Sequence, residues 1–245
     1  MNIEFLTAQN PDVLGCFQVQ SERTLYFLEQ FRKNGGHLDT LWISEYNTHS
    51  YMSSPEPPCY DVWHLLPYAI SKNDADVALW LLDQDVSVNF NNYKTLLHSL
   101  TGTTVSPLGV CLNTMGEAMA HHQDDHVQAQ YLILNRLFSL GASLFDRDAG
   151  CRSYPLDVFK TALSPSGFEK SPEIVGHALW DVLQMAQPHT QVNWAEQMTS
   201  SEEPLPCESI STQEPLMQVL RACAEKSILA KNQVVFAHKT KPHRL

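Results

Sequence analysis

Residues 137–146 (LFSLGASLFD), followed by residues 154–157 (YPLD), constrain the fold more than any other stretch. An apolar helix end stops at Gly141, which can adopt the left-handed conformation that closes a helix. A short extended segment follows, and Pro155 suits the first turn of a new helix, where its missing N–H has no partner to lose. This joint is typical of stacked helix-pair repeats, so we predict a chain built as a stack of such units.

A second unit is visible in residues 63–90. Apolar residues at 63–70 and 77–82 predict two short helices on either side of a polar turn at Asn73. Residues 85–90 (DVSVNF) then alternate as an extended segment does. Neither short helix can bury its apolar face alone, so neighbouring units must cover it.

Residues 66–82 (LPYAISKNDADVALWLL) resemble the core of the ankyrin repeat without a gap. In that family a Thr-Pro-Leu-His tetrad opens the first helix, a glycine turn follows, and Leu-Leu-x-x-Gly-Ala closes the second helix. Here residues 64–67 (HLLP) stand for the tetrad, Asn73 for the turn glycine and residues 85–86 for Gly-Ala. Three further tetrads keep the Pro-Leu pair, at 106–109 (SPLG), 154–157 (YPLD) and 214–217 (EPLM). The resemblance implies an all-α, ankyrin-like solenoid of stacked helix pairs with finger loops.

The repeats are irregular. The tetrad leucines Leu66, Leu108, Leu156 and Leu216 lie 42, 48 and 60 residues apart. An ankyrin unit has about 33 residues. We therefore expect insertions between the paired helices at 113–128 and at 164–171. A HEAT-like helical array is the alternative, and the finger segments argue against it.

Four regions follow from these patterns. Residues 1–59 are expected to be an N-terminal cap with a degenerate first unit, including a helix over 21–33 and an irregular loop over 46–60. Residues 60–185 are the ankyrin-like repeat core. Residues 186–213 are rich in Gln, Ser, Glu and Pro, so we expect them to form a flexible connection. Residues 214–245 are expected to form a C-terminal capping helix and a basic tail.

Charge is unevenly distributed along a chain of net charge −11. Residues 34–135 contain two cations and eleven anions, whereas the last twenty residues contain five cations and no acid. The overall balance argues against nucleic acid as the partner. The acidic region is either a solvated surface or a docking face for a basic protein.

The six cysteines show no zinc-binding spacing, since no two lie closer than sixteen residues. They favour a reduced, cytoplasmic protein; a secreted effector without a classical signal peptide is the alternative. The first residues lack the features of a signal peptide, and no apolar run is long enough to span a membrane. We expect no cofactor.

The compact group His121, His122, Asp124, Asp125 and His126 is a candidate metal site. On a helix, His122 and His126 would share a face and could hold one divalent ion with Asp125. A solvated polar surface is the other interpretation, because the H-E-x-x-H pattern is missing. No nucleophile elbow or phosphate-binding loop occurs in the sequence, so we do not expect an enzyme.

These features favour a protein–protein interaction module that binds, and inhibits or neutralises, a partner through a concave finger and helix surface. Such a role suits an immunity or antitoxin protein, or a bacterial effector. The alternatives are a metal-dependent enzyme and a self-associating structural subunit, and the oligomeric state stays open. The candidate partner-binding residues are Tyr68, Lys72, Asp74, Asp83, Asp85, Phe90, Asn91, Asn92, Tyr93, Asp146, Arg147 and Asp148.

Overall fold

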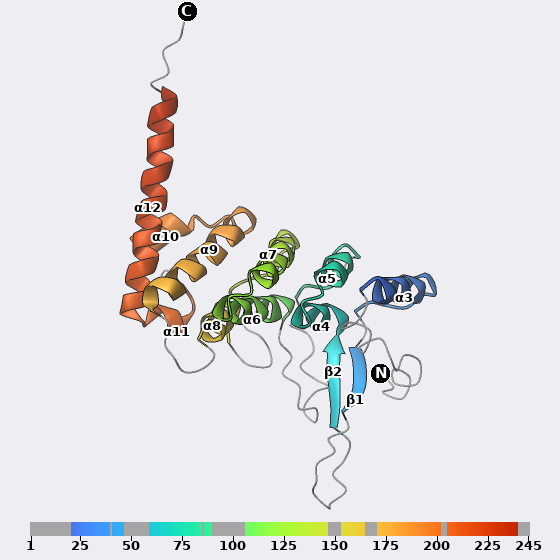
Figure 1. Ribbon diagram of the computed structural model, residues 1–245. Helices are drawn as coiled ribbons and strands as arrows, with labels where there is room; N and C mark the ends of the chain where they lie inside the picture. The colour runs from blue at the N-terminus through green and yellow to red at the C-terminus, as the bar shows by residue number, and fades with distance from the viewer. Residues whose placement is uncertain are drawn as a thin grey trace, which may run out of the picture.

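A computed structural model describes residues 21–39, 41–46, 59–84, 86–89, 106–146, 153–164, 171–201 and 205–239. The described part is mostly helical, as predicted (Figure 1). Its elements are α3 (Ser21–Lys33), β1 (Leu41–Tyr46), β2 (Cys59–His64), α4 (Leu65–Ser71), α5 (Ala75–Leu82), α6 (Pro107–Ala120), α7 (Asp124–Ser139), α8 (Pro155–Ala162), α9 (Pro172–Thr190), α10 (Trp194–Ser200), α11 (Glu208–Ser211) and α12 (Glu214–Lys239).

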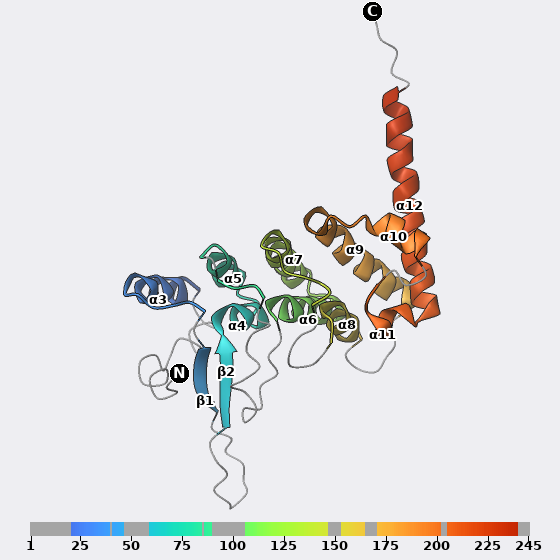
Figure 2. The ribbon, with the colours of Figure 1, turned by 180° about the vertical axis from the view of Figure 1, so that it is seen from behind.

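The helices lie in two rows (Figures 1 and 2). In the first row α6 packs between α4 and α8, and in the second row α3, α5, α7 and α9 each pack on the next. Short turns join α4 to α5 and α6 to α7, so successive helices of a pair belong to different rows. The strands extend away from α4, and α12 covers α9 at the other end. Each pair thus packs mainly on the pairs before and after it.

Each helix of the first row begins in the same way. The residues before α4, α6 and α8 are His64, Ser106 and Tyr154, and all three have extended backbone. The Ser106 Oγ accepts a hydrogen bond from the Gly109 amide at 3.0 Å, which caps α6. The predicted tetrads at 106–109 and 154–157 therefore open helices, and the tetrad at 214–217 lies at the start of α12.

Left-handed residues end four of the described helices in one common way, and a fifth, α9, ends at Gln191 with φ of 56°. Asn73 follows α4 and His122 follows α6, both with φ of 56°, while Gly35 and Gly141 follow α3 and α7 with φ of 84° and 86°. After each of these residues, the next amide donates to the carbonyl five residues earlier, at 2.9–3.0 Å. This bond closes the helix. The predicted helix over 21–33, the turn at Asn73 and the stop at Gly141 are confirmed.

The apolar core runs through both rows rather than forming one central cluster. Buried side chains of the first row include Leu66, Ile70, Leu108, Leu112, Leu156 and Phe159. Gly116 allows a close approach of α6 to α8, because a Cβ there would lie 2.7 Å from the Ala162 Cβ and 3.2 Å from the Phe159 carbonyl oxygen. A methyl group at position 116 would therefore force α6 and α8 apart.

The insertion expected at 113–128 is wrong. Helix α6 has 14 residues and α7 has 16, and only residues 121–123 separate them. In the sequence, the polar residues and Gly116 suggest that the helix ends early. In the structure, Gly116 lies at the contact with α8, and the alanine-rich end of α6 continues the helix. The long spacing between the Pro-Leu motifs thus reflects longer helices in this unit.

The flexible connection expected at 186–213 is also wrong. Helix α9 extends to Thr190, and α10 and α11 follow within this region. Trp194, Met198 and Cys207 are buried, and the Phe145 and Trp194 rings lie 5.2 Å apart. These buried apolar residues, although widely spaced among polar ones, therefore hold α10 and the start of α11 against the rest of the fold.

The antiparallel strand pair β1–β2, in which Leu41 pairs with His64, was not predicted from the helical pattern of the sequence. The helix expected over 63–70 begins only at Leu65, since Trp63 and His64 belong to β2. Parts of the expected 46–60 loop, at Tyr46 and Cys59, are likewise in strands. Residues 1–20 of the expected N-terminal cap lie outside the described residues.

Replacing Gly116→Ala should lower the free energy of unfolding by about 1–2 kcal/mol, because the clash with α8 outweighs the gain in helix propensity. Urea denaturation followed by circular dichroism measures this change. Gln128→Ala, an exposed position on α7, is the control and should change stability by less than about 0.5 kcal/mol. Equal stability of Gly116→Ala and the wild type would contradict the tight α6–α8 contact.

Stability should also depend on His64. Burial lowers the pKa of this imidazole below 6.5, although the Asp39 charge and backbone oppose the shift. The unfolded chain therefore takes up the proton first, and stability falls as pH drops from 6.5 through the lower folded pKa, by at most about 1.4 kcal/mol per pH unit. Denaturation from about pH 7.5 to 5 should show a steeper decline for the wild type than for His64→Gln. Identical slopes would contradict this role.

Candidate partner-binding surface

Asp74, a predicted binding residue, is a structural residue instead. Its side chain is buried and accepts a hydrogen bond from the Val77 amide at 3.2 Å, capping α5. The preceding residue, Asn73, accepts a hydrogen bond from the buried Gln130 Nε2 at 2.8 Å. The same Nε2 donates to the Ile70 carbonyl at 3.3 Å. Gln130 on α7 thus fixes the α4–α5 turn against the next helix pair.

Tyr68 and Lys72 lie together on α4 and its end, as the sequence predicted. The Lys72 Nζ lies 5.4 Å from the centre of the Tyr68 ring, within range of a cation–π interaction. Tyr68 is half-buried and Lys72 is exposed. This pair therefore presents an aromatic ring and a positive charge side by side at the surface.

The first row repeats the Tyr68 position. Counted from the helix starts, Val110 on α6 and Val158 on α8 are its equivalents, and all three side chains are half-buried. Farther along α6, the Asn113 Nδ2 donates to the Glu117 Oε1 at 2.9 Å. We name this surface the first-row face, made up of Tyr68, Lys72, Val110, Asn113, Glu117 and Val158.

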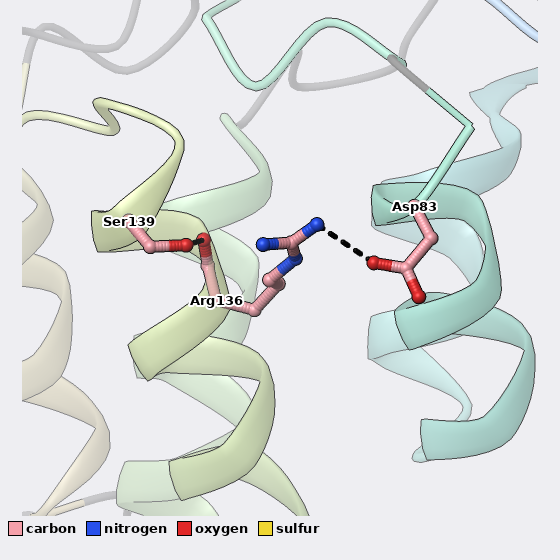
Figure 3. Close-up of polar contacts among 3 residues, drawn as sticks. All are labelled: Asp83, Arg136 and Ser139. Atoms are coloured by element: carbon pink, nitrogen blue, oxygen red, sulfur yellow. Dashed lines mark hydrogen bonds and ion pairs between the residues drawn. The ribbon is translucent and has the colours of Figure 1, made fainter.

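Asp83, another predicted binding residue, pairs within the chain. Its Oδ1 accepts a hydrogen bond from the Arg136 Nη2 at 2.8 Å, linking the ends of α5 and α7 (Figure 3). The Arg136 carbonyl in turn accepts from the Ser139 Oγ at 2.7 Å. Arg136 is not among the predicted site residues, and its position in the last turn of α7, five residues before Gly141, is the only sequence signal for it.

The loops that follow the second-row helices bind one another. The Asp39 carboxylate accepts from the Ser87 amide at 3.0 Å, and the Asn89 side chain donates to the Gly141 carbonyl at 3.3 Å. Asp146 is exposed after α7, as a binding residue would be. The predicted binding residues Asp85, Phe90, Asn91, Asn92, Tyr93, Arg147 and Asp148 lie outside the described residues.

One small hollow of about 210 Å³ lies where the loop after α3 meets the loop after α5. Its polar lining includes Arg32, His37 and Gln84. The Asp39 carboxylate also lines it, but both of its oxygens already face the Ser87 amide. The hollow is smaller than the roughly 300–1,000 Å³ of typical small-molecule pockets.

The histidines of the candidate metal site do not share a helix. His122 lies in the left-handed turn between α6 and α7, so the expected i, i+4 pairing with His126 does not form. The His126 Nδ1 instead lies 3.0 Å from the Gln123 Oε1. Asp125 is exposed in the first turn of α7. Within the described ranges, no three His, Cys, Asp or Glu side chains are placed to hold one ion.

Acidic residues gather where the second-row helices begin. The first turns contain Glu22 in α3, Asp76 in α5, Asp124 and Asp125 in α7, and Glu173 in α9. Negative charge there is favourable because helix N-termini carry partial positive charge. Asp76, Asp124 and Asp125 are exposed on the neighbouring helices α5 and α7, and we name these three residues the acidic edge.

The Asp83–Arg136 ion pair should contribute little to stability, since the two side chains are 61% and 41% exposed. A double-mutant cycle of Asp83→Ala and Arg136→Ala should give a coupling free energy of about 0–1 kcal/mol, screened by salt. Urea denaturation at low and high salt measures it. A coupling above about 2 kcal/mol would show that this pair behaves as a buried one.

No helix in the described ranges is long and apolar enough to cross a membrane. Comparison of the chain with protein-family models, with curated proteins and with solved structures gave no match. The geometry of the two helix rows and their exposed residues is therefore the basis for the functional proposal.

Proposed function

We propose that this chain is a protein–protein interaction module that binds its partner across the first-row face. The observation that carries the proposal is the repetition along this row: α4, α6 and α8 start alike and leave equivalent side chains half-exposed. A row of such positions offers an extended surface to another protein. The ankyrin resemblance supports the same use, because that family generally binds proteins in this way.

The chemistry of the first-row face suits a protein surface. Tyr68 supplies an aromatic ring of the kind enriched at interface centres. Val110 and Val158 add apolar area, while Lys72 and Glu117 supply charges of both signs. A partner that matches this face places an apolar side chain against the Tyr68–Val110 region and an acidic group near Lys72.

The acidic region remains a proposed steering surface for a basic partner. Asp83 is neutralised by Arg136, and Asp74 is buried, so neither contributes a free surface charge. Exposed charge remains at Asp76, Asp124, Asp125 and Asp146. Charges of this kind mainly raise the association rate and make it sensitive to salt. Inhibition or neutralisation of the partner would follow from covering its active surface.

A pull-down with the tagged chain, read by mass spectrometry, tests the proposal. The wild type should retain one protein in stoichiometric amount, and Tyr68→Ala/Lys72→Ala should weaken its retention at least tenfold, because the anchor and its neighbouring charge are lost. The experiment is repeated at about 50 and 500 mM salt to measure the electrostatic share of binding.

The matched control is Tyr26→Ala/Lys33→Ala, which removes the same residue types from the exposed surface of α3. This variant should retain the partner as the wild type does. An absence of any stoichiometric partner, or equal loss in both double variants, would reject binding through the first-row face.

A further inference from the structure

The thiol of Cys223 on α12 lies against an imidazole on the neighbouring helix α9. Its Sγ is 3.4 Å from the His177 Nδ1, within hydrogen-bond distance for sulfur. The two helices pack side by side in both views (Figures 1 and 2). Cys223 is 6% exposed, whereas His177 lies at the surface. The contact therefore pairs a nearly buried thiol with an exposed base.

The other cysteines with described side chains have different surroundings. Cys111 and Cys207 are fully buried, and the Cys111 Sγ lies 3.5 Å from the Gln130 backbone carbonyl. A carbonyl accepts a hydrogen bond from a thiol but does not take up its proton. Of these three cysteines, Cys223 alone lies within hydrogen-bond distance of a histidine.

Burial keeps the Cys223 thiol protonated. It raises the pKa of this thiol, while the Lys226 charge opposes the shift and the Asp181 charge adds to it. At neutral pH the S–H is therefore present and can donate to the His177 Nδ1. A thiol is a weak nucleophile until its proton is removed, so its reactivity depends on a base that accepts the proton as the sulfur attacks. His177 is placed to be that base.

A carboxylate lies one turn farther along α9, at Asp181. Burial raises the pKa of this carboxyl, and the His177 charge opposes the shift, so the two groups are close enough for their charges to interact. A carboxylate in this position stabilises the imidazolium that forms when His177 takes up a proton. Cys223, His177 and Asp181 thus supply a nucleophile, a base and a neighbouring negative charge.

The position of Cys223 in the interior of α12 limits which reaction the pair can support. Acyl transfer needs N–H donors aimed at the oxyanion of a tetrahedral intermediate. The backbone amides around Cys223 instead bond within the helix, which runs from Glu214 to Lys239. Thiol–disulfide exchange proceeds by attack on a sulfur atom and forms no oxyanion. The surroundings of Cys223 therefore favour disulfide exchange over acyl transfer.

We propose that Cys223 is a modification site for low-molecular-weight disulfides, with His177 as the base. The Cys223 Sγ attacks one sulfur of a disulfide RS–SR while its proton passes to the His177 Nδ1. The S–S bond of the reagent breaks as the new S–S bond to Cys223 forms, and the leaving thiolate takes the proton from the imidazolium and departs as RSH. One disulfide replaces another, so the exchange involves no net oxidation.

The attached group would lie at the contact between α9 and α12, where the two backbones are close. A Cβ at Gly176, next to His177, would lie 2.5 Å from the Val219 side chain. Exchange at Cys223 would therefore couple the surrounding disulfide concentration to the docking of α12 on α9. The site is on other helices than the first-row face, so it does not depend on the proposed function.

Reaction of the native full chain with dithiodipyridine, a small uncharged disulfide, tests the site. The rate constant of each cysteine is measured at neutral pH by acid quenching, digestion and mass spectrometry of the cysteine-containing peptides. Cys223 should react at least about tenfold faster than Cys111 and Cys207, because those two lack the histidine. Labelling of all three at one common rate would indicate reaction through unfolding of the chain and would overturn the proposal.

Two substitutions at His177 separate the base from simple shielding of the sulfur. His177→Gln keeps a hydrogen-bond acceptor but cannot take up a proton, and should slow the reaction of Cys223 at least about tenfold. His177→Ala should be slow as well, and added imidazole should restore part of the rate by acting as the base. An unchanged rate in His177→Gln, or a faster reaction in His177→Ala because the sulfur is less covered, would overturn the proposal.

The matched control is His189→Gln, which makes the same substitution at an exposed histidine in the last turn of the same helix. It should leave the Cys223 rate unchanged. Circular dichroism checks the fold of each variant. The Cys111 and Cys207 rates report any loosening of the chain in the same sample, and the Cys223 rate is compared with theirs.

Discussion

Burial of the first-row side chains between successive helix pairs is the interaction on which the rest of the structure depends. Leu66, Leu108 and Leu156 occupy the same position after three helix starts, and each is at most 1% exposed. Full burial of such a side chain contributes roughly 1.5–3 kcal/mol. A helix of seven or eight residues, such as α4 or α5, cannot be stable without this contribution. The first-row face and the acidic edge exist only because the pairs stack.

A few polar contacts then fix how the pairs are aligned. Gln130 is fully buried and reaches from α7 to the Asn73 side chain and the Ile70 carbonyl. Leaving this buried Nε2 without an acceptor would cost about 1–3 kcal/mol. Stacking by apolar contact alone would tolerate sliding of one pair along the next, whereas this bond is satisfied in one alignment. Asp83 and Arg136 repeat the link at the exposed ends of the same helices.

The sequence predicted those parts of the fold that depend on local backbone rules. Helix starts at Pro107 and Pro155 and stops at Asn73 and Gly141 follow from ring geometry and left-handed φ values. Features that depend on distant partners could not be predicted in this way. The sequence alone suggests a helix end at Gly116, but the structure shows that this glycine makes room for α8. Trp194 lies in a stretch predicted to be a linker, but its ring packs against Phe145. Among the candidate binding residues, Tyr68 and Lys72 are placed as expected, whereas Asp74 and Asp83 are used within the chain.

The order of neighbours in the two rows has a consequence for how the chain folds. Each helix packs mainly on the next elements along the chain or on the helices of the neighbouring pair, so its contacts stay within adjacent units of the stack. Packing between neighbouring units permits growth of the stack from any pair already formed. It also makes cooperativity local: α3, whose principal neighbour is α5, can open while α9 and α12 remain docked. The two ends of one molecule can therefore exchange between open and closed states at separate rates.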